Sequence, residues 1–154
     1  MLNNDVLRSI RYMLDLSDAK LVDVLQLAEQ TLDKATMMAF LKKEEELDYQ
    51  ECDDVTMANF LDGLVYLRRG KDQSRPALPI ELPVTNNLVL KKLRVAFELK
   101  DEDIYAMLAD AGFEVSKPEL SALFRKKDHK HFRPCGDQFL RNFLKGLTLR
   151  VRGR

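Results

Sequence analysis

The chain has 154 residues, of which 45% are hydrophobic and 32% are charged, enough for one compact domain or two small ones. No apolar run approaches the roughly 20 residues that a membrane-spanning helix requires, and no secretory signal is visible, so we expect a cytoplasmic protein without a membrane anchor. The two cysteines cannot form a disulfide framework, and the abundance of Leu, Met, Ala, Lys and Glu favours helices.

The formal net charge is zero, but the charges are divided unevenly along the chain. Residues 1–70 contain 8 Lys and Arg against 14 Asp and Glu, a net charge of −6, whereas residues 86–154 contain 15 against 9, a net charge of +6. This asymmetry indicates either different partners for the two halves or attraction between the halves, within one chain or between chains.

A strong internal repeat covers most of the chain. When the sequence is shifted by 83 residues, residues 3–70 align with residues 86–153 without a gap, and about 20 positions are identical. The densest block sets Asn59-Phe60-Leu61-x-Gly63-Leu64 against Asn142-Phe143-Leu144-x-Gly146-Leu147. We therefore predict an all-α protein of two tandem four-helix modules, residues 1–70 and 86–154, joined by a proline-rich linker at 71–85.

The first helix of each module follows a pair of asparagines, which suit an N-cap, and its apolar residues recur at helical spacing. The second helix is expected to begin after Asp18 or Asp101, which are also good caps. In the second module, Gly112 is expected to end it. The apolar residues predicted for these helices are Leu7, Ile10, Leu14, Leu21, Val24, Leu25 and Ala28 in the first module, and Leu90, Leu93, Phe97, Ile104, Met107, Leu108 and Ala111 in the second.

The third helix has its clearest start in the second module. Ser116-Lys117-Pro118-Glu119 is a capping-box pattern with proline in the first turn, and we expect the helix to continue to Lys126. Its predicted core residues are Leu120, Leu123 and Phe124, matched by Met37, Phe40 and Leu41 in the first module.

The fourth helix is predicted to begin near Asp54 or Asp137. Gly63 and Gly146 lie inside it, where glycine costs about 1 kcal/mol relative to alanine. The presence of glycine in both copies predicts a close approach to another helix. The predicted core residues are Met57, Phe60, Leu61 and Leu64, and Leu140, Phe143, Leu144 and Leu147.

Three of the five prolines lie in the linker between the modules, which we expect to be extended and fairly stiff. Leu78, Ile80 and Leu82 alternate along it, so one side is expected to lie over the two modules. The linker is therefore not predicted to be a free tether.

Several segments resemble a known family. They are Asn-Asn-x-x-Leu-Arg at 3–8, Gly-Leu-x-Tyr-x-x-Arg-Gly-Lys-Asp at 63–72, Asn-Asn-x-Val-Leu-Lys-Lys-Leu-Arg at 86–94, and Asp-His-Lys-x-Phe-Arg-x-Cys-Gly-Asp-Gln-Phe-Leu-Arg at 128–141. Over essentially its whole length, the chain resembles the YehS family, small bacterial proteins of two repeated domains of unknown function. The resemblance implies a soluble bacterial protein and brings no activity, substrate or catalytic residue.

One hypothesis is that the basic second module binds nucleic acid. The order of its second and third helices is similar to that of helix-turn-helix modules, with the third helix as the reader of the sequence. Residues predicted to reach base edges are Lys117, Ser121, Ala122 and Arg125, and those predicted to contact phosphates are Lys126, Lys127, Lys130 and Arg133. The basic end of the chain, 150–154, adds further positive charge.

Three features count against this hypothesis. The connection at 112–115 is longer than the usual tight turn, and Tyr105 stands where such modules need a small residue. The first module carries Glu44, Glu45 and Glu46 where the second carries Lys127, Asp128 and His129, so the first module is expected to repel phosphate.

The alternative is a protein–protein role, as an adaptor or as a head-to-tail oligomer of the oppositely charged modules. The densest acidic patch would then bind the partner. It includes Glu44, Glu45, Glu46 and Asp48, followed by Glu51, Asp53 and Asp54. The partner, protein or nucleic acid, stays open at this point.

Metal binding and catalysis have little support in the sequence. His129, His131 and Cys135 form an H-x-H-x₃-C pattern, but a zinc site would need a fourth ligand and tighter clustering, so no metal or other cofactor is predicted. Cys52 and Cys135 recur before the fourth helix, where a buried small apolar residue explains them equally well. We find no glycine-rich phosphate loop, no H-E-x-x-H and no Ser-His-Asp arrangement, and we expect no enzyme.

Polar residues also recur inside the helices. Arg11 and Arg94 lie in the first helix of each module, and Asn59 and Asn142 lie in the fourth. Structural polar contacts are the favoured explanation, and shared functional groups are the alternative.

Overall fold

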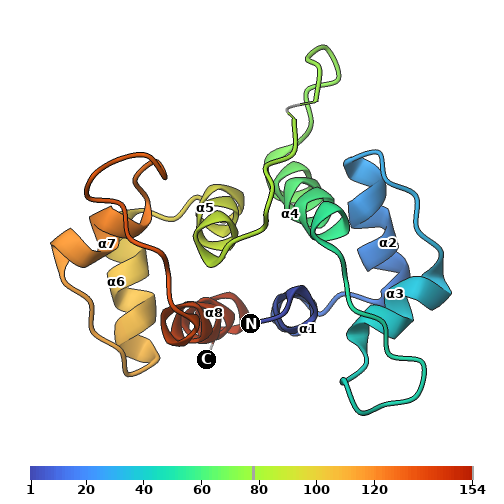
Figure 1. Ribbon diagram of the computed structural model, residues 1–154, viewed down its shortest axis with the longest axis horizontal. Helices are drawn as coiled ribbons and strands as arrows, with labels where there is room; N and C mark the ends of the chain where they lie inside the picture. Colours follow the sequence, from blue (N-terminus) through green and yellow to red (C-terminus); the bar gives the residue numbers. More distant parts are fainter. Residues whose placement is uncertain (78, 154) are drawn as a thin grey trace. The chain divides into compact units, whose positions relative to one another are not determined.

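The computed structural model describes residues 1–77 and 79–153, and these residues form helices and loops with no strand among them (Figure 1). The predicted all-α duplication is confirmed. The helices of the described residues are α1 (Asn3–Leu14), α2 (Asp18–Leu27), α3 (Lys34–Leu41), α4 (Asp54–Arg69), α5 (Asn86–Ala96), α6 (Asp101–Asp110), α7 (Lys117–Leu123) and α8 (Asp137–Arg152). The chain divides into two compact units, Met1–Val84 with α1–α4 and Thr85–Arg154 with α5–α8.

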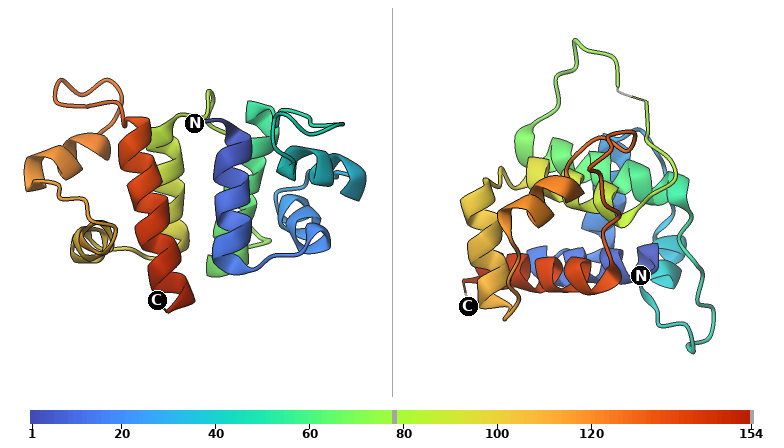
Figure 2. Two further views of the ribbon diagram at one scale, coloured as in Figure 1. Left: turned by 90° about the horizontal axis from the view of Figure 1, so that it is seen from below. Right: turned by 60° about the vertical axis from the view of Figure 1, so that its left-hand side comes forward.

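The two units repeat one helix order at a constant spacing. Each helix of the second unit begins 83 residues after its counterpart in the first, as with Asn3 and Asn86 or Asp54 and Asp137. Within each unit the first and last helices lie side by side, α1 with α4 and α5 with α8 (Figure 2). The gapless repeat in the sequence therefore corresponds to a repeat in the fold.

The main helix pair of each unit is α2 with α4, and α6 with α8. A Cβ atom added at Gly63 would lie closer than 3.0 Å to the carbonyl of Val24, and one added at Gly146 would meet the carbonyl of Met107 in the same way. The close helix approach predicted from the two glycines is confirmed.

The core of each unit is formed by the predicted apolar stripes. Phe60 and Phe143 are 1% and 0% exposed and lie at equivalent positions of α4 and α8. The apolar stripes differ from the prediction at the ends of the first helices. Met13 and Ala96 are fully buried there, whereas the predicted core residues Leu14 and Phe97 are half-buried. The predicted core residues that are only half-buried are Leu14, Ala28, Leu41, Phe97, Ala111 and Phe124.

The helix ends differ in part from the prediction. The N-caps of α1 and α5 are Leu2 and Thr85, so the paired asparagines predicted as caps lie inside the first turn. The cap before Asp18 is Ser17, whose hydroxyl accepts from the backbone N–H of Lys20, and the cap before Asp101 is Lys100. Asp18 and Asp101 are therefore the first helical residues rather than the caps.

The capping box that was predicted at Ser116 is confirmed. The Ser116 hydroxyl accepts from the backbone N–H of Glu119, and the Glu119 carboxylate accepts from the backbone N–H of Ser116. The helix that it starts is shorter than predicted, because α7 ends at Leu123 and not at Lys126. Gly112, at φ 77°, follows the C-cap of α6 as expected.

The segment after α4 groups with the first unit. The Lys71 ammonium donates to the Leu27 carbonyl at 2.7 Å, and the backbone N–H of Val84 donates to Asp54 at 3.1 Å. Of the three alternating apolar residues, Leu78 lies outside the described residues, Leu82 is half-exposed and Ile80 is half-buried. Across the described part of the chain, no helix has the length and apolar character that a membrane crossing requires.

Candidate functional site

Two long loops stand at equivalent places in the two units, between the third and fourth helices. We name residues 42–53 the acidic loop and residues 125–136 the basic loop. Backbone hydrogen bonds repeat between them at the 83-residue spacing: the Gln50 N–H donates to Ala39 O, and the Arg133 N–H donates to Ala122 O. Turns also recur at Lys43–Glu46 and Lys126–His129. The two loops therefore share one backbone path.

The paired asparagines hold the acidic loop in place. The Asn4 amide is fully buried and donates to the carbonyls of Phe40 and Gln50, both at 2.9 Å, while its oxygen accepts from the Cys52 N–H at 3.0 Å. Asn3 donates to the Cys52 carbonyl at 3.0 Å and to Asp54 at 2.8 Å. All of these partners lie at or near the ends of the loop, so α1 fixes both ends.

The basic loop is held by the same set of bonds. Asn87 donates to the carbonyls of Leu123 at 3.0 Å and Arg133 at 2.9 Å, and accepts from the Cys135 N–H at 2.8 Å. Asn86 donates to the Cys135 carbonyl at 3.0 Å and to Asp137 at 2.9 Å. The recurrence of asparagine in the sequence thus reflects a loop anchor.

The two cysteines are buried beside these anchors. Burial raises the pKa of the Cys52 thiol to about 12, with help from the carboxylates of Asp53 and Asp54. Burial, and then Asp137, raises the pKa of Cys135 to about 12 as well. Both groups are neutral thiols near pH 7, consistent with small apolar residues.

His129 and His131 are exposed to solvent, whereas Cys135 is buried. The backbone N–H of His131 donates to the ring of His129 at 3.0 Å. Within the ranges that the structure describes, no three His, Cys, Asp or Glu side chains are grouped so that they could hold a metal ion.

The residues predicted to contact nucleic acid fall on two elements. Lys117 and Ser121 are exposed on α7, whereas Ala122 is buried, so its predicted place on the exposed face of the helix is wrong. Arg125 lies beyond the end of α7, and its guanidinium is 3.3 Å from the ring of His129. The predicted residues that lie on the basic loop are all exposed: Arg125, Lys126, Lys127, Lys130 and Arg133.

The predicted acidic residues Glu44, Glu45, Glu46 and Asp48 are exposed on the acidic loop. Glu46 also has a structural part, because its carboxylate accepts from the Lys43 N–H at 2.6 Å. The remaining carboxylates of this group are presented to solvent on a turn of the loop.

The charge asymmetry of the chain is concentrated in this one pair of loops. The acidic loop has 2 Lys against 6 Asp and Glu, a net charge of −4, and the basic loop has 5 Lys and Arg against 1 Asp, a net charge of +4. Since the two modules carry −6 and +6, most of each module's net charge lies on its loop. One backbone thus presents opposite charges in the two units.

The recurring arginines form equivalent ion pairs in the two units. The Arg11 guanidinium pairs with Asp18 at 3.0 Å, and Arg94 pairs with Asp101 at 2.9 Å. These ion pairs join the first helix to the start of the second. The recurring asparagines of the fourth helix differ, because Asn59 donates to Gln30 and Asn142 donates to the carbonyl of Gln138.

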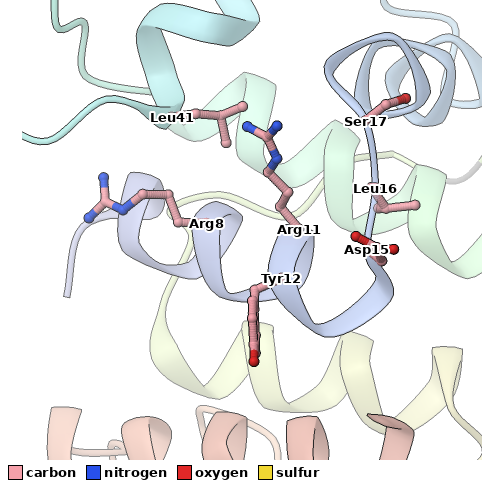
Figure 3. Close-up of a pocket in the computed structure, with 7 residues that line it drawn as sticks. All are labelled: Arg8, Arg11, Tyr12, Asp15, Leu16, Ser17 and Leu41. Carbon is pink, nitrogen blue, oxygen red and sulfur yellow. The ribbon is translucent and has the colours of Figure 1, made fainter.

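A pocket of about 500 Å³ lies in the first unit, beside the Arg11 ion pair. It is lined by Arg8, Arg11, Tyr12, Asp15, Leu16, Ser17 and Leu41. In Figure 3 the side chains of Arg11 and Leu41 extend toward the same space, whereas the Tyr12 ring points away from it. The sequence analysis did not predict this pocket. The one difference in the sequence that could have indicated it is that Leu41 stands where the second module has Phe124.

Comparisons with known proteins agree with the duplication. Residues 3–70 and residues 86–153 each match the family described as "Protein of unknown function (DUF1456)". The "Uncharacterized protein YehS" of Escherichia coli (strain K12) is 50% identical to this chain over 150 residues, which are 97% of this chain and 96% of that protein. No solved structure matches the chain. The resemblance expected from the sequence is confirmed, and the chain belongs to the DUF1456 family of proteins of unknown function.

Proposed function

We propose that this chain is a non-enzymatic regulatory binding protein whose second module binds nucleic acid through the basic loop. The observation that carries the proposal is the exposure of five Lys and Arg side chains within residues 125–133. Asn87 anchors both ends of the loop that carries them, through the carbonyls of Leu123 and Arg133. Cations of this kind bind phosphates and position a protein on a duplex.

The proposed contact is made by the loop more than by a reading helix. In a helix-turn-helix module the second helix of the motif lies in the major groove. Here α7 has 7 residues and ends before Arg125. Lys117 and Ser121 are the residues proposed to reach base edges, and the loop cations are proposed to contact phosphates. Binding is therefore expected to depend strongly on salt and weakly on sequence.

The test exchanges loop residues between the two modules. In the first variant, Lys127→Glu, Lys130→Leu and Arg133→Gln give the basic loop the residues that the acidic loop carries at the same positions. Random duplex DNA is titrated against the full chain at low and at moderate salt. We expect the unmodified chain to bind with a steep salt dependence, and the variant to bind at least about tenfold more weakly with a salt slope reduced by about 3.

The matched control is the reciprocal exchange, Glu44→Lys, Leu47→Lys and Gln50→Arg, which should leave the contribution of the basic loop in place. Because the backbone of the two loops is equivalent, neither exchange is expected to unfold its module. Binding of the unmodified chain that is absent, or that does not respond to salt, would refute the proposal.

A protein–protein role is the second candidate, supported by the opposite charges of two equivalent loops. In this case the acidic loop of one chain binds the basic loop of another, or a basic surface of another protein. Light scattering at low salt should detect an assembly that dissociates at high salt. Changing Glu44, Glu45 and Glu46 to Lys should abolish it; a mass that is unaffected by salt and by these changes would contradict the candidate.

A further inference from the structure

The second unit has an arginine–aromatic contact at the place that corresponds to the wall of this pocket. There, the Arg94 guanidinium lies over the ring of Phe124, with 4.7 Å between its central carbon and the ring centroid. Phe124 is the C-cap of α7, and its aligned position in the first unit is Leu41, the last residue of α3. The second unit therefore supplies from its own chain an aromatic ring that the first unit lacks at this position.

An equivalent ion pair lies beside this place in both units. Arg11 and Arg94 bind equivalent aspartates, at 3.0 Å and 2.9 Å. The face of a guanidinium is suited to contact with an aromatic ring. In the second unit the face of Arg94 carries the Phe124 ring, whereas Leu41 of the first unit has no ring and the pocket lies beside it.

We infer that this pocket binds an aromatic side chain of a partner protein, which stacks on Arg11 as Phe124 stacks on Arg94. A volume of about 500 Å³ accommodates such a ring with part of its backbone. The class of ligand follows from the second unit, where the ring that lies against the equivalent arginine belongs to phenylalanine. The inference goes beyond the proposed function, because it does not depend on the basic loop or on nucleic acid.

The surroundings of the pocket also indicate the charge of the partner segment. Arg8, on the wall of the pocket, donates to the carbonyl of Lys42 at 2.9 Å, and Lys42 is the first residue of the acidic loop. The loop carries a net charge of −4. Basic residues of a partner segment that extend from the pocket toward this loop would be attracted by its charge.

The experiment uses the full chain, with N-acetylphenylalaninamide as the probe and N-acetylleucinamide as its aliphatic control. NMR signals of the Arg11 side chain and of the Leu16 and Leu41 methyl groups report binding, because a stacked ring shifts nearby protons upfield. The Arg94 side chain, already under Phe124, is the internal reference. We expect saturable upfield shifts at Arg11 with the aromatic probe, at the millimolar affinity typical of a fragment, and no saturation with the aliphatic one.

Two matched variants exchange the aligned residues. Leu41→Phe should fill the pocket from within, move the Arg11 signals upfield without any probe, and weaken probe binding at least tenfold. Phe124→Leu should remove the upfield shift of Arg94 and create a response to the probe in the second unit. Each substitution introduces the residue that the other unit carries at that place, so both variants are expected to fold.

Three outcomes would overturn the inference: equal responses to both probes, unchanged binding in the Leu41→Phe variant, or saturable binding of adenosine without binding of the phenylalanine probe. A last comparison tests the charge of the partner with two peptides, in which phenylalanine is flanked by lysines or by glutamates. Tighter binding of the lysine peptide would support a basic partner segment, and equal binding would refute that part.

Discussion

Asn4 and Asn87 serve as loop anchors although their place in the sequence is typical of a cap. Each amide has two donors and one oxygen, and Asn4 uses all of them on backbone groups of the acidic loop and its flanks. A substitution that removed the amide would leave two carbonyls and one N–H without a partner, at about 1–3 kcal/mol for each group that stays buried. The need to satisfy these groups explains why asparagine occurs in both copies.

The two buried thiols make the free energy of unfolding depend on pH in the alkaline range. The unfolded Cys52 thiol loses its proton near its ordinary pKa of 9.0, and the folded one retains its proton up to about 12. The folded state therefore binds more protons in this window, and the stabilisation present below pH 9 is lost as the pH rises toward 12.

We predict that Cys52→Ala makes the fall in the free energy of unfolding between pH 9 and 12 less steep than in the unmodified chain. Urea unfolding at a series of pH values measures this slope. Cys135→Ala, at the equivalent position of the second unit, should behave alike. Slopes identical to that of the unmodified chain would contradict the assignment of raised pKa values.

Among the elements, the pairs α2 with α4 and α6 with α8 depend on a glycine at the crossing. An added Cβ would meet a backbone carbonyl, which cannot turn aside as a flexible side chain can. The helix propensity of alanine favours the substitution by about 1 kcal/mol, whereas overpacking opposes it by about 1–3 kcal/mol. The opposing effect is the larger because both helices would have to separate.

We predict that Gly63→Ala and Gly146→Ala each lower the free energy of unfolding by up to about 2 kcal/mol, the overpacking cost less the gain in helix propensity, measured by urea denaturation. Gly136→Ala is the control, because a Cβ at Gly136 has nothing within 4 Å and the backbone there has a φ of −75°. A Gly146→Ala protein as stable as the control would show that the helices can separate at little cost.

For the whole molecule, each unit has a core of its own, formed by its own four helices. A domain of about 60 residues buries enough surface to fold alone, although with a small margin. We predict that a fragment of residues 85–154 is helical by circular dichroism and unfolds cooperatively on heating. A fragment without helical signal, with the full chain folded under the same conditions, would contradict this.

The sequence by itself determined the duplication, the helical class and most of the core, because helical periodicity, capping patterns and the 83-residue repeat are local or additive signals. It also identified the charged residues at 44–48 and 125–133, since surface charge needs no knowledge of packing. Helix ends were predicted less accurately: α7 stops at Leu123 and not at Lys126, and the chain turns back so that the Arg133 N–H donates to the Ala122 carbonyl.

Only the tertiary structure decided what the recurring polar residues do. The partners of Asn4 lie 36 to 48 positions away in the chain, and those of Arg94 are Asp101 and, from another helix end, Phe124. The pocket beside Arg11 likewise forms where Leu41 of α3 packs near residues 8–17. Such contacts form when separate helices pack, and neither helical periodicity nor composition records which side chains then become neighbours.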